Sequence, residues 1–132
     1  MKIIADTNVL LRVVLDDDPA QSRAARGILS STEEIIVGRH TLCELVWVLS
    51  QTYKLPKDQI TQTVSALLNA KNVTTDQAAA EAGLRIVEAG ADFADGVIAH
   101  EGAMAGGEEF VSFDKKAVAA LAKQGVRARL LK

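Results

Sequence analysis

Residues 2–15 read KIIADTNVLLRVVL, a short apolar run followed by one acid and then a longer apolar run. The first run, residues 2–5, predicts a buried strand, and the second run, from Asn8 onward, predicts a short helix. Asp6 stands between them, where the strand gives way to the helix. The same alternation of short strand-like runs and longer helical patterns continues to the C-terminus, so this stretch sets the fold class.

Helix-capping residues and turns divide the rest of the chain into the same two kinds of element. Asp18 and Pro19 mark a strong helix start, with Asp18 as the N-cap and Pro19 at the first helical position. Strands separated by helices require crossover connections, so the sequence predicts an α/β sandwich with a mostly parallel sheet covered on both faces. The expected helices cover residues 19–29, 41–53, 56–69, 77–88, 93–105 and 114–123, and the later strands cover 35–37, 73–74, 110–112 and 127–131.

Length and composition favour one domain over residues 1–132. The chain has 132 residues, of which 48% are hydrophobic and 24% are charged, as is typical of one compact soluble unit. Cys43 is the single cysteine, so an internal disulfide is impossible and a cytoplasmic location is favoured. No run reaches the roughly 18 apolar residues of a membrane span. We therefore expect a cytoplasmic protein with no membrane partner.

The charge balance limits how this chain can bind nucleic acid. The formal net charge is −2 and only 4% of the residues are aromatic. Such a chain lacks both the basic surface that attracts phosphates in bulk and the rings on which bases stack. If it binds nucleic acid, local basic patches or a metal ion must supply the attraction.

Glu44 is the most unusual acid, because it is the only charged residue in the run LCELVWVL, residues 42–49. A helix this apolar is expected to be deeply buried, and Glu44 with it, at least in part. A buried carboxylate normally takes up a proton, pairs with a cationic side chain or coordinates a cation. The alternative to a metal site is a salt bridge with Arg39 or a lysine.

Three aspartates lie in similar apolar frames. Asp6 and Asp114 each follow a predicted strand, and Asp95 lies within FADGVIA. Ligands gather outside the carboxyl ends of the strands in parallel sheets, so these acids and Glu44 are candidates for one pocket. Oxygen ligands suit Mg²⁺ or Mn²⁺. The alternatives are that Asp6 and Asp114 are only N-caps and that Asp95 only compensates a helix dipole.

Other polar residues are assigned structural roles. Asp92 is interpreted as the N-cap of the helix that carries Asp95, in preference to a peripheral acid of the site. The acids at positions 16–18 are interpreted as a solvated turn that ends in a cap. His40 and His100 lack the spacing of a zinc site.

Four segments together resemble the PIN-domain nucleases, and among them the VapC-type toxins of bacterial type II toxin–antitoxin modules. They are IIADTNVLLRVVLDDDP (residues 3–19), TLCELVWVL (41–49), GADFADGVIA (90–99) and FVSFDKKA (110–117). The resemblance covers almost the whole chain and implies a PIN-like three-layer α/β/α sandwich. One departure is Gly96, where the family usually has alanine, and we expect this glycine to loosen the first turn of its helix.

The resemblance also implies roles for individual residues. The four family acids correspond to Asp6, Glu44, Asp95 and Asp114. Asp6 and Asp95 would be the main ligands of Mg²⁺ or Mn²⁺, Asp114 would complete the site, and Glu44 would help to hold the metal or orient the attacking water. Two further residues, Asn8 and Ser112, would fix the orientation of the carboxylates.

The implied activity is that of a metal-dependent endoribonuclease toxin. It would cleave single-stranded or tRNA-like RNA with a metal-activated water, a hydrolase reaction on phosphodiester bonds. The implied partners are the RNA substrate, a VapB-like antitoxin and operator DNA bound only through that antitoxin. A homodimer is also expected, and the apolar excess around Trp47 agrees with it.

Two other classes remain open. A catalytically inactive PIN-fold binding module is the first, although such a module would be expected to lose acids that this chain retains. The second is an aspartate-based phosphatase or phosphotransfer domain, which also uses acids at strand ends. The haloacid-dehalogenase type expects a second aspartate two residues after the first, where this chain has Asn8.

Overall fold

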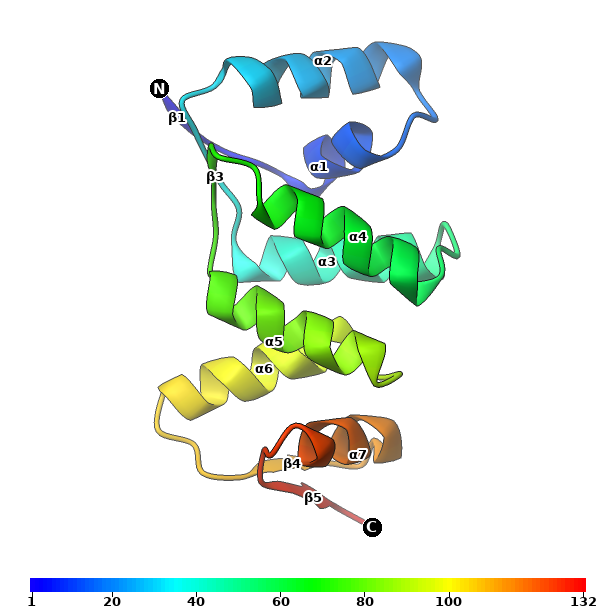
Figure 1. Cartoon of the computed structure of the whole chain (residues 1–132), viewed down its shortest axis with the longest axis vertical. Coiled ribbons are helices and arrows are strands. Elements are labelled where there is room, and N and C mark those ends of the chain that lie inside the picture. The colour runs from blue at the N-terminus through cyan, green and yellow to red at the C-terminus, as the bar shows by residue number, and fades with distance from the viewer. The chain divides into compact units, whose positions relative to one another are not determined.

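The computed structural model describes all residues from 1 to 132 and contains five strands and seven helices. By contacts the chain forms two compact units, Met1–Asp76 and Gln77–Lys132. In both units strands and helices alternate along the chain (Figure 1). The prediction of one domain over residues 1–132 stays a prediction.

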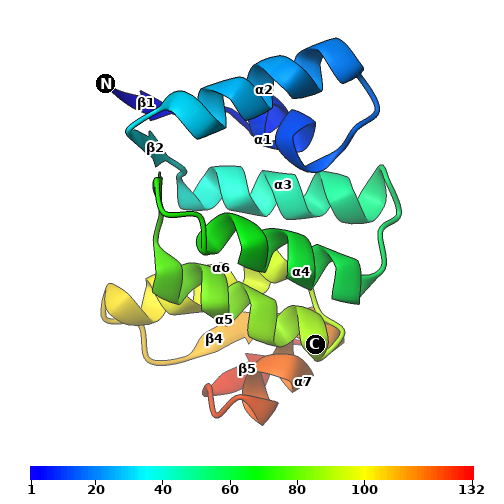
Figure 2. The same cartoon turned by 45° about the horizontal axis from the view of Figure 1, so that its top comes forward.

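The first unit holds a three-stranded parallel sheet. Its strands are β1 (Lys2–Ile4), β2 (Glu34–Ile36) and β3 (Val73–Thr74), in the order β1-β2-β3. Ile35 is the partner of Ile3 on one side and of Val73 on the other. Two helices connect each strand to the next: α1 (Thr7–Val14) and α2 (Pro19–Ser31), then α3 (Arg39–Gln51) and α4 (Lys57–Leu68) (Figure 2).

Local sequence explains where these helices begin and what they bury. The Asp18 carboxylate accepts a hydrogen bond from the Gln21 N–H at 3.2 Å, so the predicted cap of α2 is confirmed. One side of α3 is wholly buried, and Leu45 and Leu49 have no exposed surface at all. Burial of this apolar side anchors α3 in the core of the unit.

The second unit pairs the two remaining strands in parallel. They are β4 (Phe110–Ser112) and β5 (Ala128–Leu130), and α7 (Lys115–Lys123) connects them. The other two helices are α5 (Gln77–Glu88) and α6 (Phe93–Met104), which pack closely on each other. Ile86 of α5 forms a buried cluster with Ala120 and Leu121 of α7.

The structure confirms the α/β class and the parallel strands, and it corrects one detail of the opening stretch. Residues 2–5 were predicted to be a buried strand, but in β1 only Ile3 is partly buried and Ile4 is 86% exposed. Side chains of a strand point alternately to its two faces, so the face of β1 that carries Lys2 and Ile4 is the one left open. No helix of the structure has the length and apolar character needed to cross a bilayer.

Candidate metal centre

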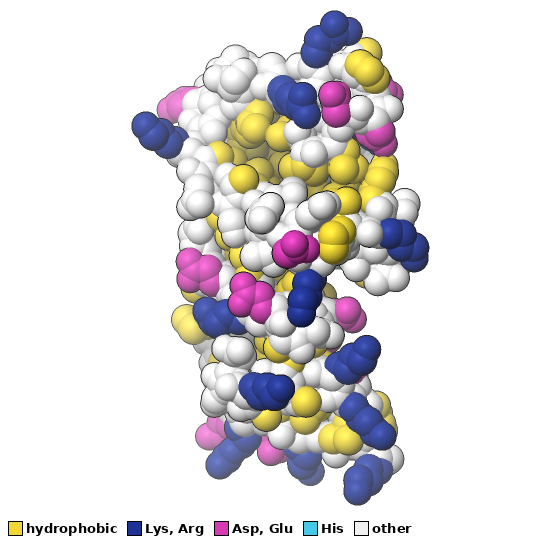
Figure 3. Space-filling model, turned by 45° about the vertical axis from the view of Figure 1, so that its right-hand side comes forward, with side chains coloured by type: hydrophobic (Ala, Val, Ile, Leu, Met, Phe, Trp, Pro, Cys, Tyr) yellow, Lys and Arg dark blue, Asp and Glu magenta, His cyan; other side chains and the backbone are white.

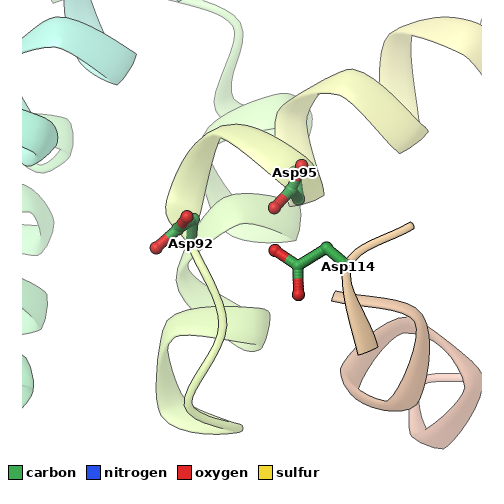
Figure 4. Close-up of side chains that lie close together, drawn as sticks. All are labelled: Asp92, Asp95 and Asp114. Carbon is green, nitrogen blue, oxygen red and sulfur yellow. The ribbon is translucent and has the colours of Figure 1, made fainter. Parts of the chain in front are cut away.

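Three carboxylates come together in the second unit. Asp92, Asp95 and Asp114 each offer an oxygen, and these oxygens all lie within 4.8 Å of one another. Asp92 and Asp95 belong to the start of α6, and Asp114 belongs to the turn between β4 and α7 (Figure 4). The second and third acids of this group, Asp95 and Asp114, are two of the four acids selected from the sequence.

Asp114 is fixed by hydrogen bonds on both sides of its turn. It is the N-cap of α7, and its Oδ1 accepts bonds from the N–H groups of Lys116 at 2.9 Å and Ala117 at 3.1 Å. The Asp114 N–H donates to Ser112 Oγ at 2.9 Å. Both capping bonds go to Oδ1, which leaves Oδ2 outside the cap. The capping role and a place in the acidic group are therefore compatible.

Asp92 occupies the N-cap position of α6, but its side chain makes no capping hydrogen bond. The interpretation of Asp92 as the N-cap residue is confirmed by its position, whereas its carboxylate lies close to those of Asp95 and Asp114 instead of bonding the helix. The spacing could have indicated this, because residues three apart at a helix start lie on the same face. The N-cap position of Asp92 offered a sufficient structural role, so its place in the acidic group was not predicted.

The electrostatics of the group centre on Asp95. Partial burial raises the pKa of the Asp95 carboxyl above its usual range, and the charges of Asp92 and Asp114 raise it further. Ionising all three acids therefore carries a cost that a divalent cation would remove. The donor set is made of carboxylate oxygens alone, which fits a hard cation such as Mg²⁺ or Mn²⁺.

Asp6 and Glu44 lie in the first unit. Asp6 is the N-cap of α1, and its Oδ1 accepts a hydrogen bond from the Thr7 N–H at 2.7 Å. Asn8 is exposed in the first turn of the same helix.

The predicted burial of Glu44 is wrong. Its side chain is 53% exposed and lies 3.1 Å from His40 Nε2, one turn earlier on α3. Burial was predicted from the apolar run, but Trp47 of the same helix is 63% exposed. The run is therefore apolar without being buried on all sides. Arg39, the partner considered for Glu44, forms an ion pair with Asp76 at 3.1 Å.

The family model described as PIN domain matches residues 3–124, so this chain belongs to the PIN domain family. PIN domains are generally metal-dependent nucleases that act on RNA. A search of curated proteins found no match.

Proposed function

We propose that this protein is a metal-dependent endoribonuclease. The observation that carries the proposal is the group of three carboxylates within 4.8 Å of one another in a chain of the PIN domain family. Asp95 and Asp114 correspond to two family acids, and Asp92 adds a third carboxylate beside them. Neighbouring carboxylates of this kind are the arrangement that a divalent cation stabilises.

In this proposal the side chains divide the work of holding Mg²⁺ or Mn²⁺. Asp95, Asp114 and Asp92 would hold the metal, and Ser112 would keep Asp114 in place through the hydrogen bond to its N–H. When bound, the metal would lower the pKa of a water, neutralise the scissile phosphate and align the displacement.

The acids of the first unit complete the proposed site residues. We assign Asp6 as a further metal ligand and Glu44 as a group that holds the metal or orients the water, because they match the remaining family acids. Asn8 would support the orientation of Asp6. Exposed Lys115 and Lys116, directly after Asp114, are suited to contact RNA phosphates.

The substrate and regulation follow the VapC-type resemblance. We propose that the target is single-stranded or tRNA-like RNA and that a VapB-like antitoxin inhibits the protein and carries the complex to operator DNA. An apolar groove of about 380 Å³ in the first unit supports a protein partner, and Ile4, Val9 and Ile28 are exposed in its lining. Figure 3 shows hydrophobic side chains open to solvent toward the top of the view, where α1 and α2 lie.

A homodimer is the proposed solution state. Trp47 is 63% exposed on α3, and large aromatic side chains are enriched at protein interfaces. A strictly monomeric mass at micromolar concentration would contradict this part of the proposal, and it would leave the nuclease assignment untouched.

The nuclease assignment is tested with the purified chain on single-stranded and tRNA-like RNAs. We expect cleavage with Mn²⁺ or Mg²⁺, none with EDTA, and none for Asp95→Asn with either metal. Mapping the product ends should show 5′-phosphates and 3′-hydroxyls. Metal binding without cleavage of any RNA would favour the inactive binding module, and metal-dependent release of phosphate from a phosphomonoester would favour the phosphatase.

The toxin assignment needs a separate test in a bacterial host. Expression of the chain should arrest growth, and co-expression with the adjacent reading frame should rescue growth and yield a co-purifying complex. Failure of both, with a nuclease that is active and toxic alone, would overturn the antitoxin part of the proposal only.

A further inference from the structure

Helices α5 and α6 touch at two glycines. A Cβ placed on Gly96 of α6 would lie 2.5 Å from the carbonyl oxygen of Ala82 and 2.7 Å from the Cα of Gly83, both in α5. Side-chain carbons essentially never approach other atoms closer than 3.0 Å. The two backbones are therefore closer here than any residue other than glycine allows.

The second glycine of the contact meets a side chain instead of backbone. A Cβ on Gly83 would lie 2.6 Å from the ring of Phe93, which is buried at the start of α6. Gly102, near the end of α6, has nothing within 4 Å of the corresponding position. Of the two α6 glycines at positions 96 and 102, only Gly96 is required by packing.

This contact gives Gly96 a packing role beside the expected loosening of the first turn of its helix. Glycine does weaken a helix that stands alone, but at position 96 it permits the close approach that joins α6 to α5. The absence of a side chain thus adds rigidity between the two helices at the residue directly after Asp95.

Helix α5 also packs against α7, the helix that begins at the third acid, Asp114. Ile86 of α5 packs against Ala120 and Leu121 of α7, and Asp114 is the N-cap of α7. Helix α5 therefore packs on both α6, which carries Asp92 and Asp95, and α7, which begins at Asp114. A change in the spacing between α5 and α6 moves two carboxylates relative to the third.

We propose that Gly96 is a positioning residue of the metal centre, which sets the distance of Asp92 and Asp95 from Asp114. The inference rests on the proposed function, because it concerns the same site. A methyl group at position 96 has backbone in its way, so α6 must retreat by about half an ångström or more to reach 3.0 Å. Metal sites tolerate deviations of only a few tenths of an ångström in ligand position.

The test uses Gly96→Ala, which introduces the residue usual in the family at this position. We expect the full-length variant to keep its helical circular dichroism and cooperative unfolding but to bind Mn²⁺ at least about tenfold more weakly by calorimetry. The electron paramagnetic resonance spectrum of bound Mn²⁺ should also change. Gly102→Ala is the matched control on the same helix, and its Mn²⁺ affinity and spectrum should equal those of the wild type.

A second pair of variants keeps the test decisive if Gly96→Ala does not fold. Gly83→Ala should weaken Mn²⁺ binding because its methyl group meets the Phe93 ring, and Gly83→Ala with Phe93→Leu should recover part of the affinity. Wild-type Mn²⁺ affinity in a folded Gly96→Ala, or in Gly83→Ala, would overturn the inference.

The result separates this inference from the proposed function. If the wild-type chain itself fails to bind Mn²⁺, the proposed function fails. The geometry is then read in the metal-free chain from nuclear Overhauser contacts between position 96 and residues 82–83. Loss of these contacts in Gly96→Ala, with retention in Gly102→Ala, would support close packing by Gly96, and their persistence in Gly96→Ala would contradict it.

Discussion

Two acidic turns of this chain use their carboxylates in opposite ways. In the turn between α1 and α2, Asp17 receives a hydrogen bond on Oδ1 from Arg12 and another on Oδ2 from the Tyr53 hydroxyl, at 3.0 Å. In the second unit, Asp95 faces Asp92 and Asp114. The hydrogen bond from Arg12 lowers the pKa of Asp17, whereas burial first, and then the neighbouring acids, raise the pKa of Asp95.

The difference teaches how to distinguish structural acids from candidate ligands. Both oxygens of Asp17 are satisfied by donors of the protein, so this acid ties the α1–α2 turn to the segment after α3. In the group around Asp95 the acids face one another, so a proton or a cation near Asp95 would lower the repulsion. The direction of the pKa displacement and the identity of the neighbours separate the two cases.

The largest expected effect is on catalysis. Asp95→Asn or Asp114→Asn should each reduce metal-dependent RNA cleavage by at least about 100-fold, because each removes a proposed ligand. Asp17→Asn should leave cleavage unchanged. Rates of RNA cleavage and Mn²⁺ affinity, measured side by side for the three variants, check this contrast, and a fully active Asp95→Asn under limiting metal would break it.

The second expected effect is on thermal stability in the absence of metal, and it should have opposite signs in the two turns. Asp95→Asn should raise the midpoint of thermal unfolding, because it removes repulsion and the cost of a partly buried charge. Asp17→Asn should lower the midpoint, because it removes the acceptor of Arg12. Calorimetry in EDTA measures both, and a fall for Asp95→Asn would show that its carboxylate is compensated by donors.

The pH dependence of stability sharpens the same comparison. The raised pKa of Asp95 means that the folded state binds its proton more tightly than the unfolded state. Stability from this group therefore increases as pH falls from above its folded pKa toward the ordinary value of 3.8. The lowered pKa of Asp17 has the opposite consequence, because its stabilisation is complete above 3.8 and is lost as pH falls through the folded pKa.

Unfolding midpoints of the wild type and both variants between pH 3 and pH 7 resolve these two contributions. Asp95→Asn should remove a gain in stability on mild acidification, and Asp17→Asn should remove part of the loss at the acid end. Identical pH profiles for all three proteins would contradict both assignments.

Much of the fold could be predicted from the sequence because its signals are local. Caps such as Asp18 with Pro19, and apolar runs between turns, depend on neighbours within a few residues, and every predicted helix and strand has a counterpart in the structure. The exposure of β1 depends on which elements cover its two faces, and that information is not local.

The features of the candidate site also divide into local ones, which could be predicted, and non-local ones, which could not. Asp95 and Asp114 could be selected because an acid in an apolar frame is visible in the sequence. Asp92 does occupy the predicted N-cap position, but the proximity of its carboxylate to Asp114 involves a residue distant in the sequence. The packing role of Gly96 was missed because the backbone of α5 creates it.

Glu44 is an intermediate case between Asp17, which pairs with an arginine, and Asp95, which faces other acids. The smallest effect is expected here. It pairs with His40 at 3.1 Å, and a histidine is charged only when protonated, unlike the arginine beside Asp17. An exposed pair of this kind on one helix contributes only about 0.3–0.5 kcal/mol to stability. Because the side chain is 53% exposed, Glu44→Ala should cost no core packing and should unfold almost as the wild type does.

Glu44→Gln should nevertheless slow RNA cleavage by about tenfold if the acid orients the attacking water. His40→Gln, which removes the partner but keeps the acid, is the control and should cleave at the wild-type rate. Equal rates for all three proteins would make Glu44 a surface ion pair like many others, and they would leave the acids of the second unit as the whole of the catalytic assignment.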